Sequence, residues 1–192
     1  MADQVRILAF AGSTREASFN KRLLAIAAAG ARAAGASVTL IDLRDFSLPL
    51  YDGDLEAAER PPAEATRLRG LMLGHGGFLI ASPEYNSGMS GVLKNAFDWV
   101  SRPAGDEPKL APFSGKVAAI MAASGGGLGG LRGLVHLRMI LGNIGTIVLP
   151  GQLAVRNAAD AFADDGSLKD AVQQAAAERL GENVADMLAK LE

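Results

Sequence analysis

Five short apolar runs, separated by helical patterns, organise this chain. They cover residues 5–11, 38–41, 77–81, 117–123 and 146–149. None alternates strictly between polar and apolar positions, which is typical of strands that are covered on both faces. Helical patterns between such strands favour βαβ crossovers. We therefore expect an α/β fold with a five-stranded parallel sheet and helices on both of its faces.

Helices are predicted between and after these strands. Apolar residues recur at helical spacing from Phe19 to Ala34, and Gly35 is suited to end that helix because it tolerates left-handed geometry. The same spacing recurs over residues 168–191, where Ser167 and Asp170 resemble a capping box. Further helices are expected near residues 63–74, 90–101 and 129–141. The pattern predicts five strands and five helices in a single domain over residues 1–192.

Two stretches lack a regular pattern. Residues 42–62 contain three prolines, and residues 150–166 follow the last predicted strand. Both are expected to be surface connections, although long loops in compact domains often serve as lids or subunit contacts. That second interpretation stays open, and it is stronger for residues 42–62.

The composition argues against several classes of protein function. A chain of 192 residues suits one domain, and 49% hydrophobic with only 5% aromatic residues favours close helix-on-sheet packing. The net charge is −2 and the basic residues are scattered, so binding to nucleic acid or to an anionic membrane is not predicted. The absence of cysteine excludes disulfides, thiolate metal sites and cysteine nucleophiles.

Targeting and metal signals are also missing from the sequence. No basic segment followed by a long apolar stretch opens the chain, and no apolar run approaches the roughly 20 residues that span a bilayer. We expect a cytoplasmic protein. His75 and His136 lie far apart in the sequence, so no metal site is predicted, and both are expected at the surface or an interface.

The loop after the first strand has the composition of an anion site. Gly12 permits a tight turn, Ser13 offers a hydroxyl, Arg15 a positive charge, Ser18 a helix cap and Asn20 an amide. The first turn of a helix also presents free N–H groups. The loop lacks the Gly-Lys-Ser/Thr of a triphosphate loop, so a terminal monophosphate fits better. The alternative is a plain strand-to-helix turn capped by Ser18, with Arg15 solvated.

The loop after the third strand offers backbone groups to a flat heterocycle. Pro83 ends the strand, and Glu84, Tyr85 and Asn86 then cross the top of the sheet. Gly88 is expected to allow a backbone reversal. In the helix that follows, Leu93, Ala96, Phe97 and Val100 form a core stripe, and Trp99 is expected to fill a domain edge.

These strings resemble a known family. Ser82-Pro83-Glu84-Tyr85-Asn86, followed by Gly91-Val92-Leu93-Lys94-Asn95-Ala96-Phe97-Asp98-Trp99, is similar to the signature of the NADPH-dependent FMN reductases. That flavodoxin-like family includes chromate, quinone and azo-dye reductases. The first loop resembles the family's phosphate loop, and Leu48-Pro49-Leu50-Tyr51-Asp52 resembles its segment after the second strand. The resemblance implies a doubly wound sheet with strand order 2-1-3-4-5.

The resemblance also implies site residues. Ser13, Arg15, Ser18 and Asn20 would hold the FMN phosphate. Pro83, Glu84, Tyr85, Asn86 and Gly88 would line the ribityl chain and the isoalloxazine ring. Many members have proline where this chain has Ser90. Serine is a favourable N-cap, so we expect the helix from Gly91 to persist.

The loop after the fourth strand is rich in glycine. Gly125, Gly127 and Gly130 fit Gly-x-Gly-x-x-Gly, but the acidic residue expected about 20 positions later in a dinucleotide site is missing. By the resemblance, the backbone of Ser124, Gly125, Gly126 and Gly127 lies against the flavin edge, because glycine permits close approach. A separate dinucleotide site and a turn without a ligand remain alternatives.

The resemblance implies an enzyme that oxidises NADPH or NADH through non-covalently bound FMN and reduces a small acceptor. Quinones, azo compounds, chromate, ferric chelates and free flavin all remain open. No catalytic proton-transfer residue is assigned, since the flavin carries the chemistry. Members usually form dimers or tetramers, and Tyr85 and the helix from Gly91 are the expected contacts. One alternative is a non-enzymatic, flavodoxin-like electron carrier. Another is a doubly wound domain that binds a different phosphorylated ligand or serves only in protein interaction.

Overall fold

The computed structural model describes residues 4–59, 61–103, 106–108 and 110–191. Its main sheet has five parallel strands in the order β2-β1-β3-β6-β7. The strands are β1 (Arg6–Ala11), β2 (Ser37–Asp42), β3 (Gly77–Ala81), β6 (Val117–Ala123) and β7 (Ile147–Val155). Counted along the chain within this sheet, the order is 2-1-3-4-5. The predicted topology is therefore confirmed.

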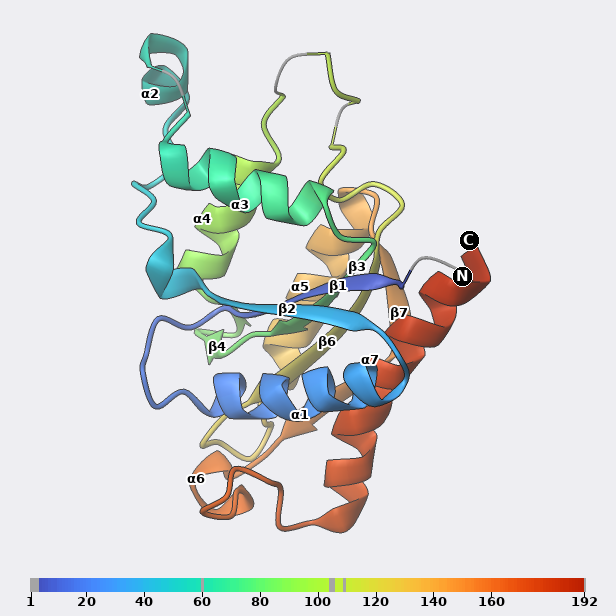
Figure 1. Cartoon of the computed structure of the whole chain (residues 1–192). Coiled ribbons are helices and arrows are strands. Elements are labelled where there is room, and N and C mark those ends of the chain that lie inside the picture. The colour runs from blue at the N-terminus through green and yellow to red at the C-terminus, as the bar shows by residue number, and fades with distance from the viewer. Residues whose placement is uncertain (1–3, 60, 104–105, 109, 192) are drawn as a thin grey trace.

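Helices cover both faces of the sheet (Figure 1). The helices α1 (Phe19–Ala33) and α7 (Ala171–Leu191) pack on one face, and α3 (Ala63–Leu73), α4 (Gly91–Val100) and α5 (Leu131–Asn143) pack on the other. Because successive side chains of a strand point to opposite faces of the sheet, the side chains of β1 alternate between these two helical layers. Ile7 and Ala9 point toward α1 and α7, whereas Leu8 and Phe10 belong to the opposite core.

The helices α1 and α7 approach each other closely through glycine. A Cβ atom on Gly30 would lie 2.1 Å from the carbonyl oxygen of Glu178. One on Gly181 would lie 1.9 Å from the carbonyl oxygen of Ala27. Both distances are far below van der Waals contact, so this crossing requires glycine on each helix. It fixes the C-terminal helix to the helix that follows the first loop.

The last strand is longer than predicted. It runs through Pro150 to Val155, although the sequence pattern suggested an irregular stretch from residue 150. The register shifts between its two halves, because Val148 pairs with Ala118 while Gln152 pairs with Ile120. A proline is tolerated in such an irregularity on an edge strand. The strand therefore resumes after a bulge.

Short elements also occur where loops were expected. They are the 3₁₀ turn η1 (Leu43–Asp45) and the helices α2 (Gly53–Ala58) and α6 (Ala158–Ala161). The capping box assigned to Ser167 is wrong, because α7 begins only at Ala171. Asp170 instead accepts hydrogen bonds from the backbone N–H groups of Val172 and Gln173, and the Ser167 hydroxyl donates to Asp165. No helix in the described ranges has the length and apolar character needed to cross a bilayer.

Candidate functional site

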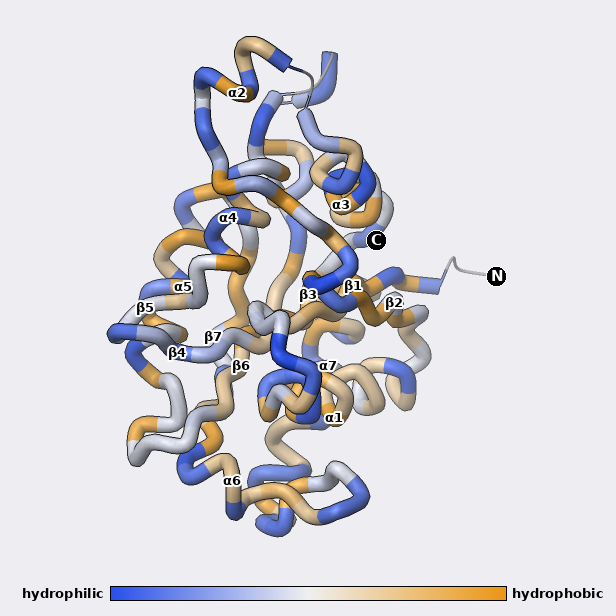
Figure 2. Tube along the Cα trace, turned by 90° about the vertical axis from the view of Figure 1, so that its left-hand side faces the viewer, coloured by the Kyte–Doolittle hydropathy of each residue, from blue (hydrophilic) through white to orange (hydrophobic). Residues whose placement is uncertain are grey.

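The three predicted loops begin side by side at the carboxyl edge of the sheet. Figure 2 is turned so that this edge faces the reader. The first residue after each of β1, β3 and β6 still donates a backbone hydrogen bond to the neighbouring strand. These bonds run from Gly12 to Ala81 (2.8 Å), from Ser82 to Met121 (2.9 Å) and from Ser124 to Val155 (3.1 Å). Neighbouring strands thus hold the starting points of the loops in fixed register.

The first loop, residues 12–18, places its polar groups around the N-terminus of α1. Ser13 is buried, and its Oγ accepts a hydrogen bond from the backbone N–H of Arg15 at 3.3 Å. The Arg15 side chain is exposed. Ser18 is the N-cap residue of α1, but its hydroxyl does not bond to the first-turn N–H groups. The capping role predicted for that hydroxyl is therefore wrong. The hydroxyl instead sits at the positive end of the helix dipole without a capping bond.

Arg44, in η1, supports this loop from outside. Its Nε donates to the carbonyl oxygen of Thr14 at 3.1 Å, and its guanidinium lies 3.7 Å from the carboxylate of Glu16. No local sequence pattern predicts this contact, because Arg44 lies 30 residues from Thr14 in a stretch without a regular pattern.

Asn20 is bonded within the protein. Its Nδ2 donates to the carbonyl oxygen of Ala123 at 2.9 Å, and its Oδ1 accepts from the Ala123 N–H at 2.9 Å. The side chain is buried, with 3% of its surface exposed. This reciprocal pair engages both ends of the amide. The geometry thus favours a bridge from α1 to the end of β6 over the direct phosphate contact that the resemblance implies.

The second loop, residues 82–90, contains a hairpin that the hydrophobic pattern did not predict. Its strands are β4 (Glu84–Tyr85) and β5 (Gly88–Met89). The chain reverses at Asn86 and Ser87, whose φ angles are 51° and 67°. Two positive φ angles are typical of the type I′ turn found in tight hairpins. The reversal therefore lies at the two residues before Gly88, to which it was assigned, and Gly88 begins the returning strand. An Asn at the first turn position was the signal that could have located it.

Glu84 uses its side chain to hold this hairpin against α5. Its carboxylate accepts hydrogen bonds from the Gly133 N–H at 3.0 Å and from Nε of Arg132 at 2.9 Å. Only 8% of the side chain is exposed. Burial would raise the pKa of the Glu84 carboxyl, but the Gly133 N–H and the Arg132 guanidinium outweigh it and hold that pKa below its ordinary value. The carboxylate is thus already hydrogen-bonded within the protein, so only the backbone of Glu84 is free to contact a ligand.

Ser90 joins the second loop to the first. Its hydroxyl accepts from the N–H of Leu93, as expected of an N-cap, so the prediction that α4 persists is confirmed. The same hydroxyl donates to the carbonyl oxygen of Gly12 at 2.6 Å. Ser90 is only 1% exposed. This second bond lies next to the predicted phosphate loop and was not foreseen.

The polar residues of α4 have a structural role. The side chains of Asn95 and Trp99 both donate to the carbonyl oxygen of Pro49 at 2.8 Å. The Asn95 side chain also accepts from the N–H of Tyr51 at 2.8 Å. Trp99 is 2% exposed, in agreement with the expectation that it fills an edge of the domain. These residues secure the segment after β2.

The third loop, residues 124–130, contains two kinds of glycine. Gly129 and Gly130 have φ angles of 63° and 93°. A Cβ atom would lie 2.8 Å from the Ala154 backbone at Gly129 and 2.6 Å from Cβ of Ala122 at Gly130. The fold itself requires these two glycines. At Gly125 and Gly127, in contrast, a Cβ atom would meet no atom of the described residues within 4 Å, and at Gly126 only the Ser124 hydroxyl at 3.9 Å.

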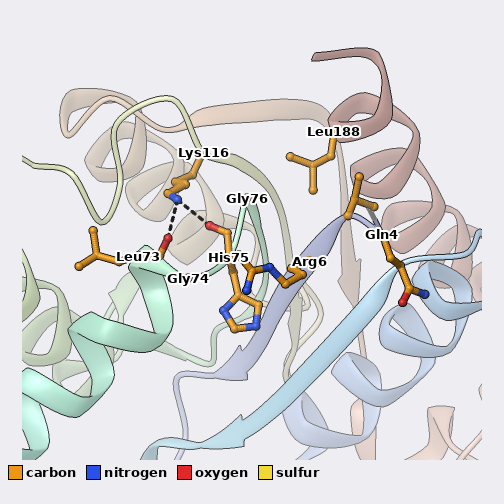
Figure 3. Close-up of a pocket in the computed structure, with 9 residues that line it drawn as sticks. Gln4, Arg6, Leu73, Gly74, His75, Gly76, Lys116 and Leu188 are labelled. Carbon is orange, nitrogen blue, oxygen red and sulfur yellow. Dashed lines mark hydrogen bonds between the residues drawn. The ribbon is translucent and has the colours of Figure 1, made fainter. Parts of the chain in front are cut away.

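A cavity of about 660 Å³ lies at the opposite, amino edge of the sheet (Figure 3). Arg6, His75 and Lys116 line it. Burial, and next the nearby charge of Arg6, lower the pKa of the Lys116 amine, which donates to the carbonyl oxygen of His75 at 2.7 Å. His75 is 9% exposed, so its predicted surface position is wrong. None of the residues predicted to bind FMN lines this cavity. Across the described ranges, no three potential ligands among His, Asp and Glu gather into a metal-binding group.

Curated proteins of known activity are similar to this chain in sequence. The chain is 40% identical over 171 residues to an NAD(P)H-dependent FMN reductase of Pseudomonas aeruginosa, with 88% of each chain covered. It is 35% identical over 142 residues to a quinone reductase of Escherichia coli K12, covering 73% of this chain and 71% of the relative.

The solved structures include FerB, a flavoenzyme NAD(P)H:(acceptor) oxidoreductase from Paracoccus denitrificans. It is 27% identical, with a TM-score of 0.81 over 97% of this chain and 98% of the other. The sequence profile named NADPH-dependent FMN reductase matches residues 5–160. That span includes the three loops and every strand of the main sheet. The chain therefore belongs to the NADPH-dependent FMN reductase family.

Proposed function

We propose that this protein binds FMN non-covalently between its three carboxyl-edge loops and uses it to reduce a small acceptor at the expense of NADPH or NADH. Family membership and the names of the relatives support an oxidoreductase rather than a non-enzymatic electron carrier. The quinone reductase among the relatives makes a quinone the first acceptor to test. We further propose that the chain acts in the cytoplasm as one domain.

The glycine triplet of the third loop is the observation that carries this proposal. Gly125, Gly126 and Gly127 are exposed, and their φ angles lie outside the left-handed region. Neither packing nor backbone geometry demands glycine there. A run of glycines at the carboxyl end of a central strand then fits a ligand that must approach the backbone closely. A flat ring meets that condition.

The first loop supplies the groups suited to a phosphate. Ser13 and Ser18 offer hydroxyls beside the positive end of α1, and Arg15 adds an exposed guanidinium that can bind two phosphate oxygens. The backbone of Pro83, Tyr85 and Asn86 and that of the glycine triplet would face the ring. When bound, FMN would supply the hydride and electron-transfer chemistry. The residues of this chain would hold and orient it.

Titration of the apoprotein with FMN, followed by visible absorption and by NADPH and NADH oxidation with a quinone, tests the proposal. We expect a one-to-one complex that turns over with quinone. Gly125→Ala should leave the free energy of unfolding unchanged or raise it by up to about 1 kcal/mol, yet weaken FMN binding at least tenfold. In the matched control Gly142→Ala, on α5, a Cβ atom meets no described atom within 4 Å, and FMN binding should not change.

The two variants separate the possible outcomes. If the wild-type protein does not bind FMN, the proposed function is wrong. If Gly125→Ala binds FMN as tightly as the wild type does, the third loop does not contact the ring.

We also propose that the protein forms a homo-oligomer through α5 and the hairpin. Leu131, Val135 and Met139 lie on one exposed side of α5 with 42%, 63% and 62% of their surfaces exposed, and Tyr85 is 54% exposed. A contiguous apolar stripe of this kind is typical of a protein interface. The outer side of α4, where the contact was expected, instead carries the Lys94–Asp98 ion pair. In the proposed contact between subunits, Tyr85 is therefore retained from the sequence-based expectation, and α5 takes the place of α4.

A further inference from the structure

We propose that Ser90, Glu84 and Asn20 are positioning residues that connect the three carboxyl-edge loops in pairs, either directly or through the strand end or helix turn that borders a loop. The inference rests on the proposed FMN function. It assigns two residues that the family resemblance would place on the cofactor, Glu84 and Asn20, to the support of the site. It also gives Ser90 a part in cofactor binding.

Ser90 connects the second loop to the first. Its hydroxyl donates to the Gly12 carbonyl at 2.6 Å from a position that is 1% exposed. The contact is tight, since a Cβ atom on Gly12 would lie 2.9 Å from that hydroxyl. Gly12 is also fixed on its other side by the bond from its N–H to Ala81. The start of the first loop is therefore held from two directions. Of these two hydrogen bonds, only the one from Ser90 involves a side chain and can be removed by substitution without altering the sheet.

Glu84 connects the second loop to the third. Its carboxylate accepts a hydrogen bond from the N–H of Gly133, in the first turn of α5. It also accepts a hydrogen bond from the guanidinium of Arg132 and forms an ion pair with it. The third loop ends where α5 begins. The carboxylate thereby fixes the hairpin relative to the end of the glycine-rich segment, and the helix dipole favours a negative charge at this point.

Asn20 connects the third loop to the first. Its amide forms the reciprocal pair with the N–H and carbonyl of Ala123, which immediately precedes the third loop. Asn20 itself lies in the first turn of α1. With Ser90 and Glu84, it completes a closed circuit in which each loop, directly or through the strand end or helix turn that borders it, is connected by a side-chain hydrogen bond to the other two. A circuit of this kind holds the loops in one arrangement before any ligand arrives, which lowers the ordering cost of binding.

The circuit makes different predictions for two ligands. FMN would span all three loops, since its phosphate would lie on the first loop and its ring on the second and third. Riboflavin has the same ring and no phosphate, so it would use only the second and third loops. Breaking the connection between the first and second loops should therefore weaken FMN binding and leave riboflavin binding almost unchanged. Breaking the connection between the second and third should weaken both equally.

The experiment measures the dissociation constants of FMN and riboflavin for the full-length apoprotein. Ser90→Ala removes the donor to Gly12, and we expect FMN binding to weaken about three- to tenfold, the effect of one lost hydrogen bond, with riboflavin affected less than twofold. Glu84→Gln should weaken both ligands by a similar factor. Ser101→Ala is the matched control, because this hydroxyl donates to the Asp98 carbonyl at the other end of α4. It should change neither constant.

A general loss of stability would weaken both ligands alike, so the ratio of the two constants separates positioning from folding for Ser90. For Glu84→Gln, urea unfolding of the same apoprotein makes that distinction. Ser90→Gly serves as a second variant, because glycine is tolerated at an N-cap and also lacks the hydroxyl. The inference is overturned if the ratio in both Ser90 variants equals that of the wild type. It is also overturned if Glu84→Gln changes the ratio as Ser90→Ala does. A wild-type protein that binds neither ligand would contradict the proposed function instead.

Discussion

At the scale of single residues, the site depends on polar side chains that are engaged by the protein itself. Glu84 is the clearest case, because an almost fully buried carboxylate is kept charged by one backbone N–H and one guanidinium. Its pKa lies below the ordinary value of 4.5 in the folded protein. Such a carboxyl stabilises the fold fully above its unfolded pKa, and that contribution is lost as the pH falls through the folded pKa.

We therefore expect Glu84→Gln to be less stable than the wild type near neutral pH and to approach it in acid. The difference in the free energy of unfolding should begin to shrink below a pH of about 4.5. Urea titrations from pH 7 down to pH 3 measure this difference. Glu59→Gln is the control, because it makes the same change of charge at an exposed side chain. A Glu84→Gln difference that does not depend on pH would show that the carboxylate is not stabilised in this way.

Arg15 gives a prediction about the cofactor. Arg15→Ala should weaken FMN binding by about 1.5–3 kcal/mol, the value of a hydrogen bond to a charged group. Isothermal titration of the apoprotein measures it. Arg179→Ala makes the same change of charge on the exposed side of α7 and should have no effect. Equal affinities in the wild type and Arg15→Ala would remove Arg15 from the site.

From the sequence, the kind of ligand that this edge suits could be predicted, but the hydrogen-bond partner of each polar side chain could not. The residue types of Ser13, Arg15 and Ser18 suit a phosphate whatever the rest of the chain does. The partner of Asn20, however, lies 103 residues away and that of the Ser90 hydroxyl 78 residues away. Such pairings depend on how the loops are brought together, and no local pattern encodes them.

At the scale of elements, the close crossing of α1 and α7 requires glycine at the contact between the two helices. Gly181→Ala would force a methyl group onto the Ala27 carbonyl, so we expect a loss of stability of about 1–3 kcal/mol, or more if the helices separate. Thermal and urea unfolding measure this loss. Gly142→Ala adds the same methyl group to α5 without a contact and should be neutral or stabilising by up to about 1 kcal/mol. If the two variants are equally stable, the crossing is looser than described.

Elements with a strong period were predictable, whereas those made by local backbone geometry were not. The buried strands and α1 follow from apolar runs and a three-to-four residue spacing. The β4–β5 hairpin is only four strand residues long, and the resumption of β7 after Pro150 depends on pairing with β6. Neither leaves a period in the sequence that is long enough to detect.

At the scale of the whole molecule, the apolar stripe on α5 predicts assembly. If the proposed oligomer forms, Val135→Lys should lower its sedimentation mass without loss of folding, because Val135 is 63% exposed in the single chain. Tyr85→Asp should act in the same direction. Val172→Lys is the control, since Val172 is 78% exposed on α7, away from the stripe, and should leave the mass unchanged. An unaltered mass in both test variants would place the contact elsewhere.

The glycine contact between α1 and α7 has a consequence for how the protein is made. The helix that follows the proposed phosphate loop packs against residues more than 140 positions further along the chain. A nascent polypeptide must therefore be synthesised past Gly181 before α1 gains its permanent neighbour. We therefore expect the proposed FMN site to reach its final arrangement only after α7 has packed on α1.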